Sequence, residues 1–439
     1  MKKLFAWVLA LAMLLSVCTA FAEAEQGKVL NIYCWNTEFK DRFEYFKASE
    51  LYDEGITVNF IITPNEGGAY QKALDEALLA QEGAAADDRV DIFLVEADYA
   101  LKYVNTDYTL DVIKDVGLTA EDIAGQYAYT QEIVTNDLGA IKGVTWQATP
   151  GLFAYRRSIA KDVLGTDDPA AVQEALKDWA SFDAVAEQAA AKGYKMLSGY
   201  DDAYRVFANN ISAPLVQDGK IVIDQKLFDW VEQTKNYTDK GWNNKTSLWA
   251  PEWSADQGPD GKVFGFFYST WGINFTLLGN SLADPNAAKE VGNGIFGDYA
   301  VCEGPASWYW GGTWICAAAG TDNIDYIRDV MYVMSCDKDT LKQITLDTQD
   351  YTNTVAGMQE IADDPSYGAA FLGGQNHVAL FAKSAANIDM SNTSAYDQLI
   401  TETFQRCMKD YFDGNVPSVE AAYENFQTEI LEIYPDLSF

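Results

Sequence analysis

Aromatic side chains crowd around a glycine pair in the stretch Ser307-Trp308-Tyr309-Trp310-Gly311-Gly312-Thr313-Trp314. A ring with a polar edge suits a ligand that is apolar on its faces and polar at its rim, which describes a pyranose sugar. A lone tryptophan is more often packed in a core than in contact with a ligand. Clustering beside glycines, which let the backbone bend sharply, favours binding for this group. We therefore take Trp308 and Trp310 as candidate contacts to a carbohydrate.

Polar residues also follow the predicted strands of the first hundred residues. Hydrophobic periodicity predicts strands at 29–33, 56–62 and 90–95, with amphipathic helices between them. This alternation implies a parallel sheet that binds ligands at the carboxyl ends of its strands. The candidate contacts at those ends are Trp35, Asn36, Glu38, Asn65, Glu96 and Asp98.

Two short extended pieces flank Pro150-Gly151 between Val144 and Tyr155, as expected of a chain that crosses between two lobes. Trp146 and Tyr155 are candidate contacts in this region, and Asp201 is a further one.

The α/β alternation continues beyond this point. Ser181 can cap a helix that Gly193 ends, residues 194–197 read as a strand, and Gly241 closes a helix over 225–240. The second half of the chain is therefore also expected to be α/β.

Length and charge bound the function. A chain of 439 residues suggests two or three domains. Its 65 acidic and 31 basic side chains give a formal charge of −34, which argues against nucleic acid as a partner. The only histidine is His377, so the sequence offers no basis for Ser-His-Asp catalysis or for a His-rich zinc site. We predict no cofactor and no metal.

The N-terminus has the pattern of an export signal. Lys2 and Lys3 precede an apolar segment over 4–17, and Ala20-Phe21-Ala22 has the small-x-small pattern of a cleavage site. We predict that residues 1–22 are a signal peptide, in preference to lipid attachment at Cys18, because Val17 is bulkier than the residue usual before a lipidated cysteine. Since no later window offers about 20 apolar residues, we predict no membrane span in the mature chain.

Five cysteines remain after that cleavage, an odd number at wide spacings. Neither a disulfide framework nor a CxxC metal signature can be derived from them, so we predict no structural disulfide.

The glycines of Gly292-Asn293-Gly294-Ile295-Phe296-Gly297 match the GxGxxG pattern of dinucleotide sites. That fingerprint requires a strand before it and a helix after it. Here a strand is predicted after it instead, at 296–301, so we interpret the glycines as a turn.

The segment Gly265-Phe266-Phe267-Tyr268-Ser269-Thr270-Trp271-Gly272 resembles the strand-turn-helix of family 1 extracellular solute-binding proteins, the receptors of carbohydrate ABC transporters. Four further landmarks, at 29–36, 151–165, 177–193 and 311–340, resemble the family in the same order. The resemblance covers nearly all of the mature chain.

The resemblance implies a two-lobed, periplasmic-binding-protein-like α/β fold with discontinuous lobes joined by crossing hinge strands. The expected N-terminal lobe is 23–148 and 268–314, and the C-terminal lobe is 149–267 and 315–439. Crossings are expected near 145–155, 263–270 and 312–318. Trp271 then joins Trp310 as a residue expected to stack on the ligand, and the implied partners of the monomer are a sugar and the permease subunits of an ABC transporter.

Two other functions fit the same residues. A secreted glycan-active enzyme would need a pair of carboxylates across the scissile bond, and Glu38, Glu66, Glu96 and Asp98 could supply one. A receptor for a cation such as a polyamine would also suit a cleft of tryptophans and carboxylates, with Glu96 and Asp98 as the residues that raise this alternative.

Overall fold

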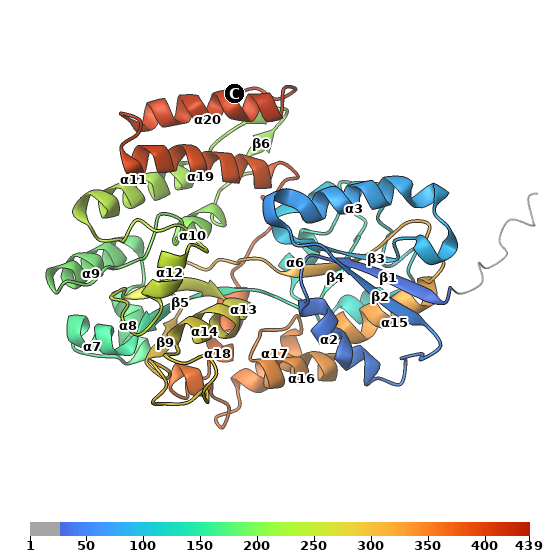
Figure 1. The fold of residues 1–439 in the computed structure, drawn as a ribbon, viewed down its shortest axis with the longest axis horizontal. Helices are drawn as coiled ribbons and strands as arrows, with labels where there is room; N and C mark the ends of the chain where they lie inside the picture. Colours follow the sequence, from blue (N-terminus) through green and yellow to red (C-terminus); the bar gives the residue numbers. More distant parts are fainter. Residues whose placement is uncertain (1–26) are drawn as a thin grey trace, which may run out of the picture.

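Two sheets organise the chain, which a computed structural model describes from residue 27 to residue 439. Each sheet belongs to one of two α/β lobes that lie side by side, with helices around both (Figure 1). The predicted signal peptide and Cys18 lie outside the described residues. Within the described residues, no helix is both long enough and apolar enough to cross a membrane.

The first lobe contains a five-stranded sheet in the order β2-β1-β3-β10-β4. Strand β1 pairs in parallel with both β2 and β3, which confirms the parallel sheet predicted for the first hundred residues. Strand β10 adds antiparallel to β3, and β4 adds antiparallel to β10. The strands are β1 (Val29–Cys34), β2 (Thr57–Ile62), β3 (Ile92–Glu96), β4 (Val144–Thr145) and β10 (Thr313–Ala317).

Helices cover both faces of this sheet because its strands are apolar on both sides. Leu94 packs with the buried face of α2, whereas Phe93 and Val95 pack with α3. Figure 1 shows α3 on one side of the sheet and α2 and α15 on the other. The helices of this lobe are α2 (Glu38–Lys47), α3 (Ala69–Ala80), α4 (Ala100–Val104), α5 (Ala120–Ile123), α6 (Ala128–Glu132), α15 (Ile324–Ser335) and α16 (Lys338–Thr348).

The second lobe is built on a three-stranded antiparallel sheet in the order β8-β5-β9. Its strands are β5 (Gly151–Arg156), β8 (Gly265–Ser269) and β9 (Tyr299–Cys302), and a separate hairpin joins β6 (Val216–Gln217) to β7 (Lys220–Ile221). The α-helices around them are α7 (Arg157–Leu164), α8 (Pro169–Ala175), α9 (Trp179–Ala191), α10 (Tyr204–Ala208), α11 (Gln225–Lys240), α12 (Pro251–Asp256), α13 (Thr270–Gly272) and α14 (Leu278–Ser281), with a π-helical turn at Ile273–Leu277.

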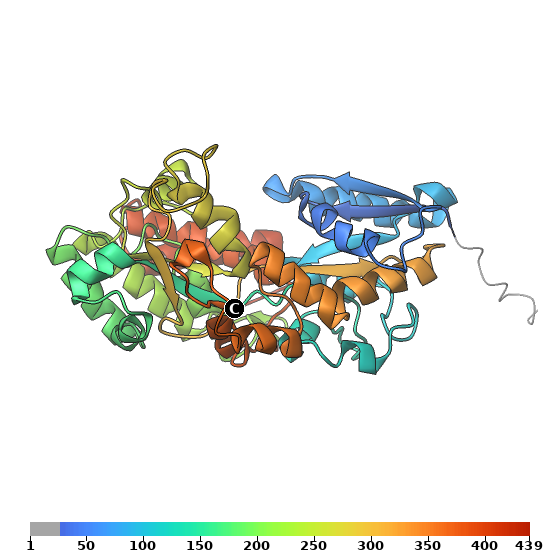
Figure 2. The ribbon, with the colours of Figure 1, turned by 90° about the horizontal axis from the view of Figure 1, so that it is seen from below.

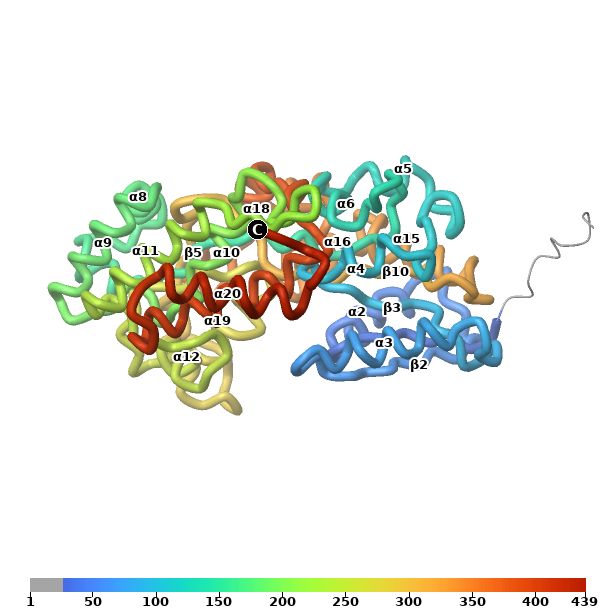
Figure 3. Tube along the Cα trace, turned by 90° about the horizontal axis from the view of Figure 1, so that it is seen from above, coloured from blue at the N-terminus to red at the C-terminus, as the bar shows by residue number. Residues whose placement is uncertain are grey.

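The C-terminal helices complete the second lobe. Helices α17 (Val355–Ala362) and α18 (Val378–Ala385) pack on each other, and α18 also contacts β5. The long helices α19 (Asp397–Asp413) and α20 (Val419–Ile433) run side by side, and α19 packs on α11 (Figure 3). Gly414 ends α19 in the left-handed conformation, with a φ of 79°, as a C-terminal glycine should.

Three segments connect the lobes, and they lie next to one another (Figure 2). The first, 146–150, is central: Trp310 N donates to Thr149 O on one side, and Ala148 N donates to Tyr351 O on the other. Trp310 belongs to the second segment, 308–312, which leads into β10. Tyr351 belongs to the third segment, 349–353, which leads out of the first lobe. The crossing expected near 145–155 has the predicted position.

The sheets divide the chain at other points than those expected from the resemblance. Strand β8 does not cross at 263–270, because it pairs with β5 and the chain returns to the same sheet as β9. Residues 313–348 belong with the first lobe, since β10 pairs with β3 and α15 packs on α2. The expected assignment of 268–314 to the first lobe is therefore wrong over most of that segment, because β9 belongs to the second lobe. The expected assignment of 315–439 to the second lobe is wrong for 315–348 and agrees with the packing of the C-terminal helices. The crossing at 349–353 was not predicted.

Local predictions fail in two places for visible reasons. Helix α9 begins earlier than expected because Asp178, not Ser181, is its cap: the Asp178 carboxylate accepts from Ser181 N at 2.7 Å. Residues 194–197 form no strand beyond an isolated bridge from Lys195 to Val263. The glycines of 292–297 do form turns, and β9 rather than a helix follows them. All five described cysteines are free thiols.

Candidate functional site

A cavity of about 560 Å³ opens between the lobes, with the crossing segments at its floor. Its size lies within the usual range of small-molecule sites. The first lobe contributes the end of β1 and the start of α2, and the second lobe contributes α13 and the loop before α12. The lining residues are Trp35, Asn36, Thr37, Glu38, Asp41, Arg42, Glu96, Gln147, Trp249, Thr270, Trp271, Asn274, Phe275, Trp310, Gly311, Gly312, Thr313, Thr348 and Asp350.

Three tryptophans form the second-lobe wall of this cavity. Trp271 lies edge-on to Trp310 with ring centroids 5.1 Å apart, and Trp249 lies nearly parallel to Trp271 at 6.1 Å. Trp271 Nε1 donates to Trp310 O at 3.0 Å, so the polar edge of this ring is already engaged. What the wall presents to the cavity is therefore mainly aromatic carbon.

An ion pair behind this wall holds Trp310 and also joins the lobes. The Arg205 guanidinium lies over the Trp310 ring, 5.3 Å from its centroid, as in a cation–π contact. The same guanidinium donates twice to Asp98 of the first lobe, at 2.9 and 2.6 Å. Although burial alone would raise it, the pKa of Asp98 is held below its ordinary value by the Arg205 charge and its hydrogen bonds. Asp98 is therefore committed to Arg205.

The first-lobe wall is formed where β1 gives way to α2. Trp35 is half-buried and meets Tyr70 and Tyr99 edge-on, which leaves the rest of its ring toward the cavity. Asn36 Oδ1 accepts from Glu38 N at 2.9 Å and so fixes the entry into the helix.

A chain of hydrogen bonds runs across the cavity floor from one lobe to the other. Gln147 Nε2 donates to Glu38 Oε1 and to Asp350 Oδ2, both at 3.0 Å, and Thr270 Oγ1 donates to Asp350 Oδ1 at 2.5 Å. Glu38 belongs to the first lobe, Thr270 to the second, and the other two to the crossing segments. Burial and the neighbouring Asp350 charge raise the pKa of Glu38 to about 7, against smaller lowering effects of Arg42 and Gln147. The floor is therefore sensitive to proton uptake near neutrality.

Glu96 ends β3 and lies between the floor and the tryptophan wall. Its Oε2 accepts from Asp98 N at 2.9 Å, while its Oε1 lies close to Gly311: a Cβ placed there would be 3.6 Å from this oxygen and 3.2 Å from Trp271 Nε1. Burial first, and then the Asp98 charge, raise the pKa of Glu96 above its ordinary value. Gly311 has a φ of 71°, so a glycine at this position permits both the bend and the close approach.

The structure brings six of the predicted contacts together around the cavity. Two of them, Trp271 and Trp310, come from the second lobe and from a crossing segment. Only 7% of the Trp310 surface is exposed, so this ring presents an edge to the cavity more than a free face. The six are Trp35, Asn36, Glu38, Glu96, Trp271 and Trp310.

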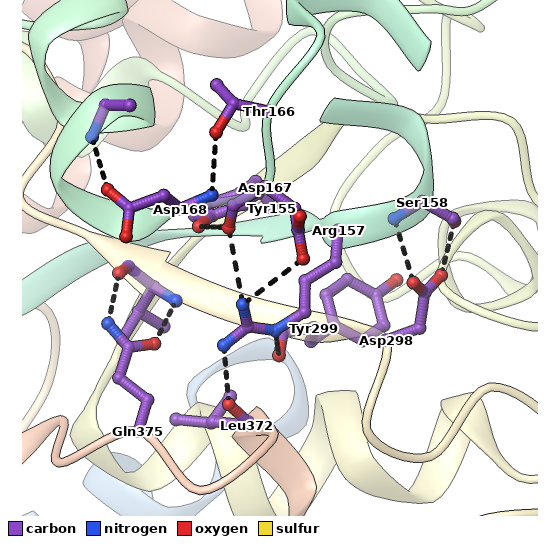
Figure 4. Close-up of polar contacts among 12 residues, drawn as sticks. Tyr155, Arg157, Ser158, Thr166, Asp167, Asp168, Asp298, Tyr299, Leu372 and Gln375 are labelled. Atoms are coloured by element: carbon purple, nitrogen blue, oxygen red, sulfur yellow. Dashed lines mark hydrogen bonds and ion pairs between the residues drawn. The ribbon is translucent and has the colours of Figure 1, made fainter. Parts of the chain in front are cut away.

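The other six predicted contacts do not line the cavity, for identifiable reasons. Trp146 and Trp308 are buried core residues, 0% and 1% exposed. Tyr155 points away into the second lobe, where its hydroxyl donates to Asp167 O beside Arg157, as Figure 4 shows. The remaining three that lie outside the lining are Asn65, Asp98 and Asp201.

The Arg157 cluster around Tyr155 is an anchor for the second lobe. Arg157 donates to Asp167 O, Tyr299 O and Leu372 O, and so ties α7 to β9 and to the loop before α18 (Figure 4). Gln375 adds a pair of hydrogen bonds to the Val301 backbone in the same place. These contacts satisfy buried backbone groups and leave Tyr155 a structural role.

Asp201 acts on the cavity indirectly, through the loop that carries Trp249. Its Oδ2 accepts from Leu248 N at 3.3 Å, next to Trp249, whose backbone has a left-handed φ of 69°. This conformation is unfavourable for a tryptophan and persists only when its surroundings enforce it. Trp249 is 54% exposed and contacts both Trp253 and Trp271.

Several lining residues escaped sequence reasoning. Trp249 is one of two tryptophans in the proline-containing segment 243–262, and that composition is the signal that could have found it. No sequence pattern marks Gln147 or Asp350 as a cavity residue. Each reaches the cavity only because crossing segments that are distant in sequence pack against one another. Thr270 stands beside Trp271 in the quoted motif but was not singled out.

Comparisons with known proteins show the fold. No protein-family model matches the chain, and no curated protein does. A solved extracellular solute-binding protein of family 1 has a TM-score of 0.72 at 16% identity, covering 91% of this chain and 98% of that one. A binding protein associated with an ABC transporter from B. animalis subsp. lactis, in complex with β-1,6-galactobiose, has a TM-score of 0.65 at 17% identity, covering 92% and 97%.

A third neighbour has the same architecture. The galacto-N-biose/lacto-N-biose I-binding protein of an ABC transporter from Bifidobacterium longum, in complex with lacto-N-biose, has a TM-score of 0.67 at 14% identity, covering 94% of this chain and 100% of that one. These likenesses span nearly the full length of both partners. The chain therefore has the two-lobed α/β fold of extracellular solute-binding proteins, which confirms the predicted fold class.

Proposed function

We propose that the protein is an extracellular receptor that captures a carbohydrate in the cleft between its lobes and delivers it, unchanged, to the permease of an ABC transporter. The observation that carries this proposal is the cavity itself. Tryptophan rings dominate the wall on the side of the second lobe, hydrogen-bonding groups dominate the floor, and the first-lobe wall offers both a ring, Trp35, and polar side chains such as Asn36. A pyranose needs both an apolar surface for its faces and polar partners for its hydroxyls.

The structural neighbours support the ligand class. Two of them were solved with β-1,6-galactobiose and lacto-N-biose bound. Their identities to this chain are 17% and 14%, so the proposed ligand is a mono- or oligosaccharide and not a particular sugar. Export through the predicted signal peptide and docking on permease subunits belong to the same proposal.

The crossing segments support lobe closure over the ligand. Each contains a residue with a left-handed backbone: Thr149 at a φ of 26°, Gly311 at 71° and Gln349 at 60°. Hinges are a few residues that absorb backbone rotation, and the three segments that hold these residues are bridged to one another between the sheets. A bound ligand should therefore draw the lobes together, and the radius of gyration from small-angle scattering should fall on saturation.

The proposal excludes turnover, and this part needs its own test. Two cavity carboxyls, Glu38 and Glu96, have raised pKa values, a property that glycosidase acids share. In this structure Glu38 is held by Gln147, and Glu96 by the Asp98 backbone, so both have structural partners. Oligosaccharide incubated with protein far below the substrate concentration should remain intact; accumulation of products would establish an enzyme instead.

Isothermal titration calorimetry against a broad glycan panel tests the binding itself. We expect saturable binding of at least one mono- or oligosaccharide with one site per chain. Thermal shift with the same panel should agree, because a ligand that binds only the native state raises the melting temperature. If no glycan binds while linear polyamines do, the carbohydrate assignment is wrong.

A further inference from the structure

The hydrogen-bonding groups around the cavity are unbalanced. Five lining side chains already give their N–H or O–H groups to protein acceptors: Gln147, Thr270, Trp271, Asn274 and Thr348. The donors left in the lining include those of Asn36, Thr37, Arg42, Trp249, Trp310 and Thr313. Four carboxyl side chains add acceptor oxygens to the same lining, and the best partner for them is a ligand group that donates several hydrogen bonds and accepts none.

The charges of the lining have the same bias. Four carboxyl groups, those of Glu38, Asp41, Glu96 and Asp350, line the cavity with a single guanidinium, that of Arg42, and the raised pKa values of Glu38 and Glu96 mean that these two are fully charged only above neutral pH. Arg42 lies 3.9 Å from Glu38 and offsets that carboxylate first. A cleft with walls of low dielectric constant focuses such an excess and concentrates ions of the opposite sign.

Glu96 is the carboxylate with capacity left for a ligand. Asp350 already accepts from Thr270, Gln147 and its own neighbour Tyr351 N. Glu96 accepts from Asp98 N through one oxygen, and its other oxygen lies beside Gly311 at the edge of the tryptophan wall. A cation placed there would touch a carboxyl group and an aromatic ring together, and both attract ammonium groups.

We infer that the ligand of this cavity carries a protonated primary amine that binds between Glu96 and the tryptophan wall, and that the carbohydrate is accordingly an amino sugar with a free amine. This inference rests on the proposed function, since it names the class of sugar for the same cavity. An ammonium supplies three donors and no acceptor, which matches the unbalanced lining. N-acetylation would remove the charge and two of those donors.

Proton release provides a signature that neutral sugars lack. Besides burial, the charges of Asp98 on the following turn and of Glu402 on α19 raise the pKa of Glu96, while the Arg205 charge on α10 and the hydrogen bond from Asp98 N lower it. An ammonium beside Glu96 favours the ionised carboxylate, so the carboxyl gives its proton to the buffer when the amine binds near neutral pH. A neutral sugar brings no such charge.

Matched disaccharides test the inference by calorimetry at pH 6.5, below the pKa of about 7.7 to 8.0 typical of an α-amino group. The probes are the β-1,4-linked disaccharide of glucosamine, its N,N′-diacetyl form, cellobiose and spermidine. We expect the free-amine disaccharide to bind at least about tenfold more tightly than the two neutral ones. Titration in two buffers with different ionisation heats should show release of about one proton for the amine alone.

The outcomes separate this inference from the proposed function. Neutral disaccharides binding as tightly as the amine would overturn the amine inference and leave the carbohydrate receptor intact. Spermidine binding without any glycan binding would support amine recognition and overturn the proposed function. Absence of binding by both amine-bearing probes would overturn the inference.

A matched pair of variants locates the contact. Glu96→Gln keeps the size of the side chain and removes its charge, so amine binding should weaken at least about tenfold and proton release should vanish. Glu402→Gln removes a charge that acts on Glu96 from outside the cavity lining and should change amine affinity less than about threefold. Equal losses in both variants would show a diffuse field rather than a contact at Glu96. Melting temperatures confirm that each variant folds.

Discussion

Trp308 and Trp310 lie two residues apart on one crossing segment, yet they belong to different regions of the molecule. Trp308 is 1% exposed and packs on the second-lobe sheet, where a Cβ on Gly151 would come within 2.0 Å of its ring. Trp310 is 7% exposed, carries the Arg205 guanidinium over its ring and lines the cavity. The segment thus places one tryptophan, Trp308, in the core and another, Trp310, at the cavity.

The difference teaches that surroundings, and not residue type, assign a tryptophan to packing or to binding. Burial decreases in order from Trp308 to Trp310 to Trp249, which is 54% exposed. A ring enclosed by protein stabilises the folded state, whereas an exposed ring is buried only when a ligand binds and then stabilises the complex. Mutations along this series should therefore shift from effects on stability to effects on affinity.

The largest effect is expected at Trp308, on the free energy of unfolding. Trp308→Ala removes an enclosed ring and leaves a cavity against Gly151, so unfolding free energy should fall by roughly 3 to 5 kcal/mol. Affinity per folded molecule should stay close to wild type. Chemical denaturation and calorimetry on the folded fraction measure the two quantities. Loss of affinity with intact stability would place Trp308 in the binding site and break the comparison.

The next effect concerns the ion pair that supports Trp310. Arg205→Gln should lower unfolding free energy by about 1.5 to 3 kcal/mol, the range for hydrogen bonds to charged groups, because the two bonds from Arg205 to Asp98 are lost. Asp98→Asn tests the other half, and the double variant should cost less than the sum of the two. Additive losses would show that the pair does not join the lobes energetically.

Across the cavity, Glu38 should make stability depend on pH. Its folded-state pKa of about 7 exceeds the ordinary value of 4.5, so the folded state holds the proton more tightly. Glu38 therefore contributes its full share to the free energy of unfolding below its ordinary pKa. This share is lost as the pH rises toward the folded-state pKa, and the free energy of unfolding falls by at most about 1.4 kcal/mol per pH unit. Denaturation between pH 5 and pH 8 should show this slope in wild type and a weaker one in Glu38→Gln. Identical slopes in wild type and in Glu38→Gln would show that Glu38 does not cause the pH dependence of stability.

The smallest effect is expected at the exposed end of the series. Trp249→Ala should weaken sugar binding by about 0.5 to 1.5 kcal/mol, the range for aromatic pairs, with little loss of stability. Trp249→Gly is the matched control: it removes the same ring but relieves the left-handed backbone, so it should be more stable than the alanine variant. Unchanged affinity in both variants would leave Trp249 without a role in binding.

Local structure could be predicted well in the first hundred residues. The alternation in 56–62 predicted β2, and the amphipathic pattern after the first strand predicted α2, because periods of 2 and 3.6 are properties of neighbouring residues. Half of the twelve candidate contacts line the cavity, including four of the six placed at strand ends: Trp35, Asn36, Glu38 and Glu96. Asp98 lies outside the lining and pairs with Arg205, which is distant in sequence.

The sequence by itself determined the α/β class, the limits of the strongly periodic elements and the ring-rich stretch near Gly311. Only the tertiary structure decided which sheet β8 and β10 join, since pairing depends on long-range burial that no local period encodes. It also decided that Trp308 packs against Gly151 while Trp310 lines the cavity, because residues two apart in extended backbone share one face and only their surroundings distinguish them. Gln147 and Asp350 meet Glu38 for the same reason, when three crossing segments from distant parts of the chain pack against one another.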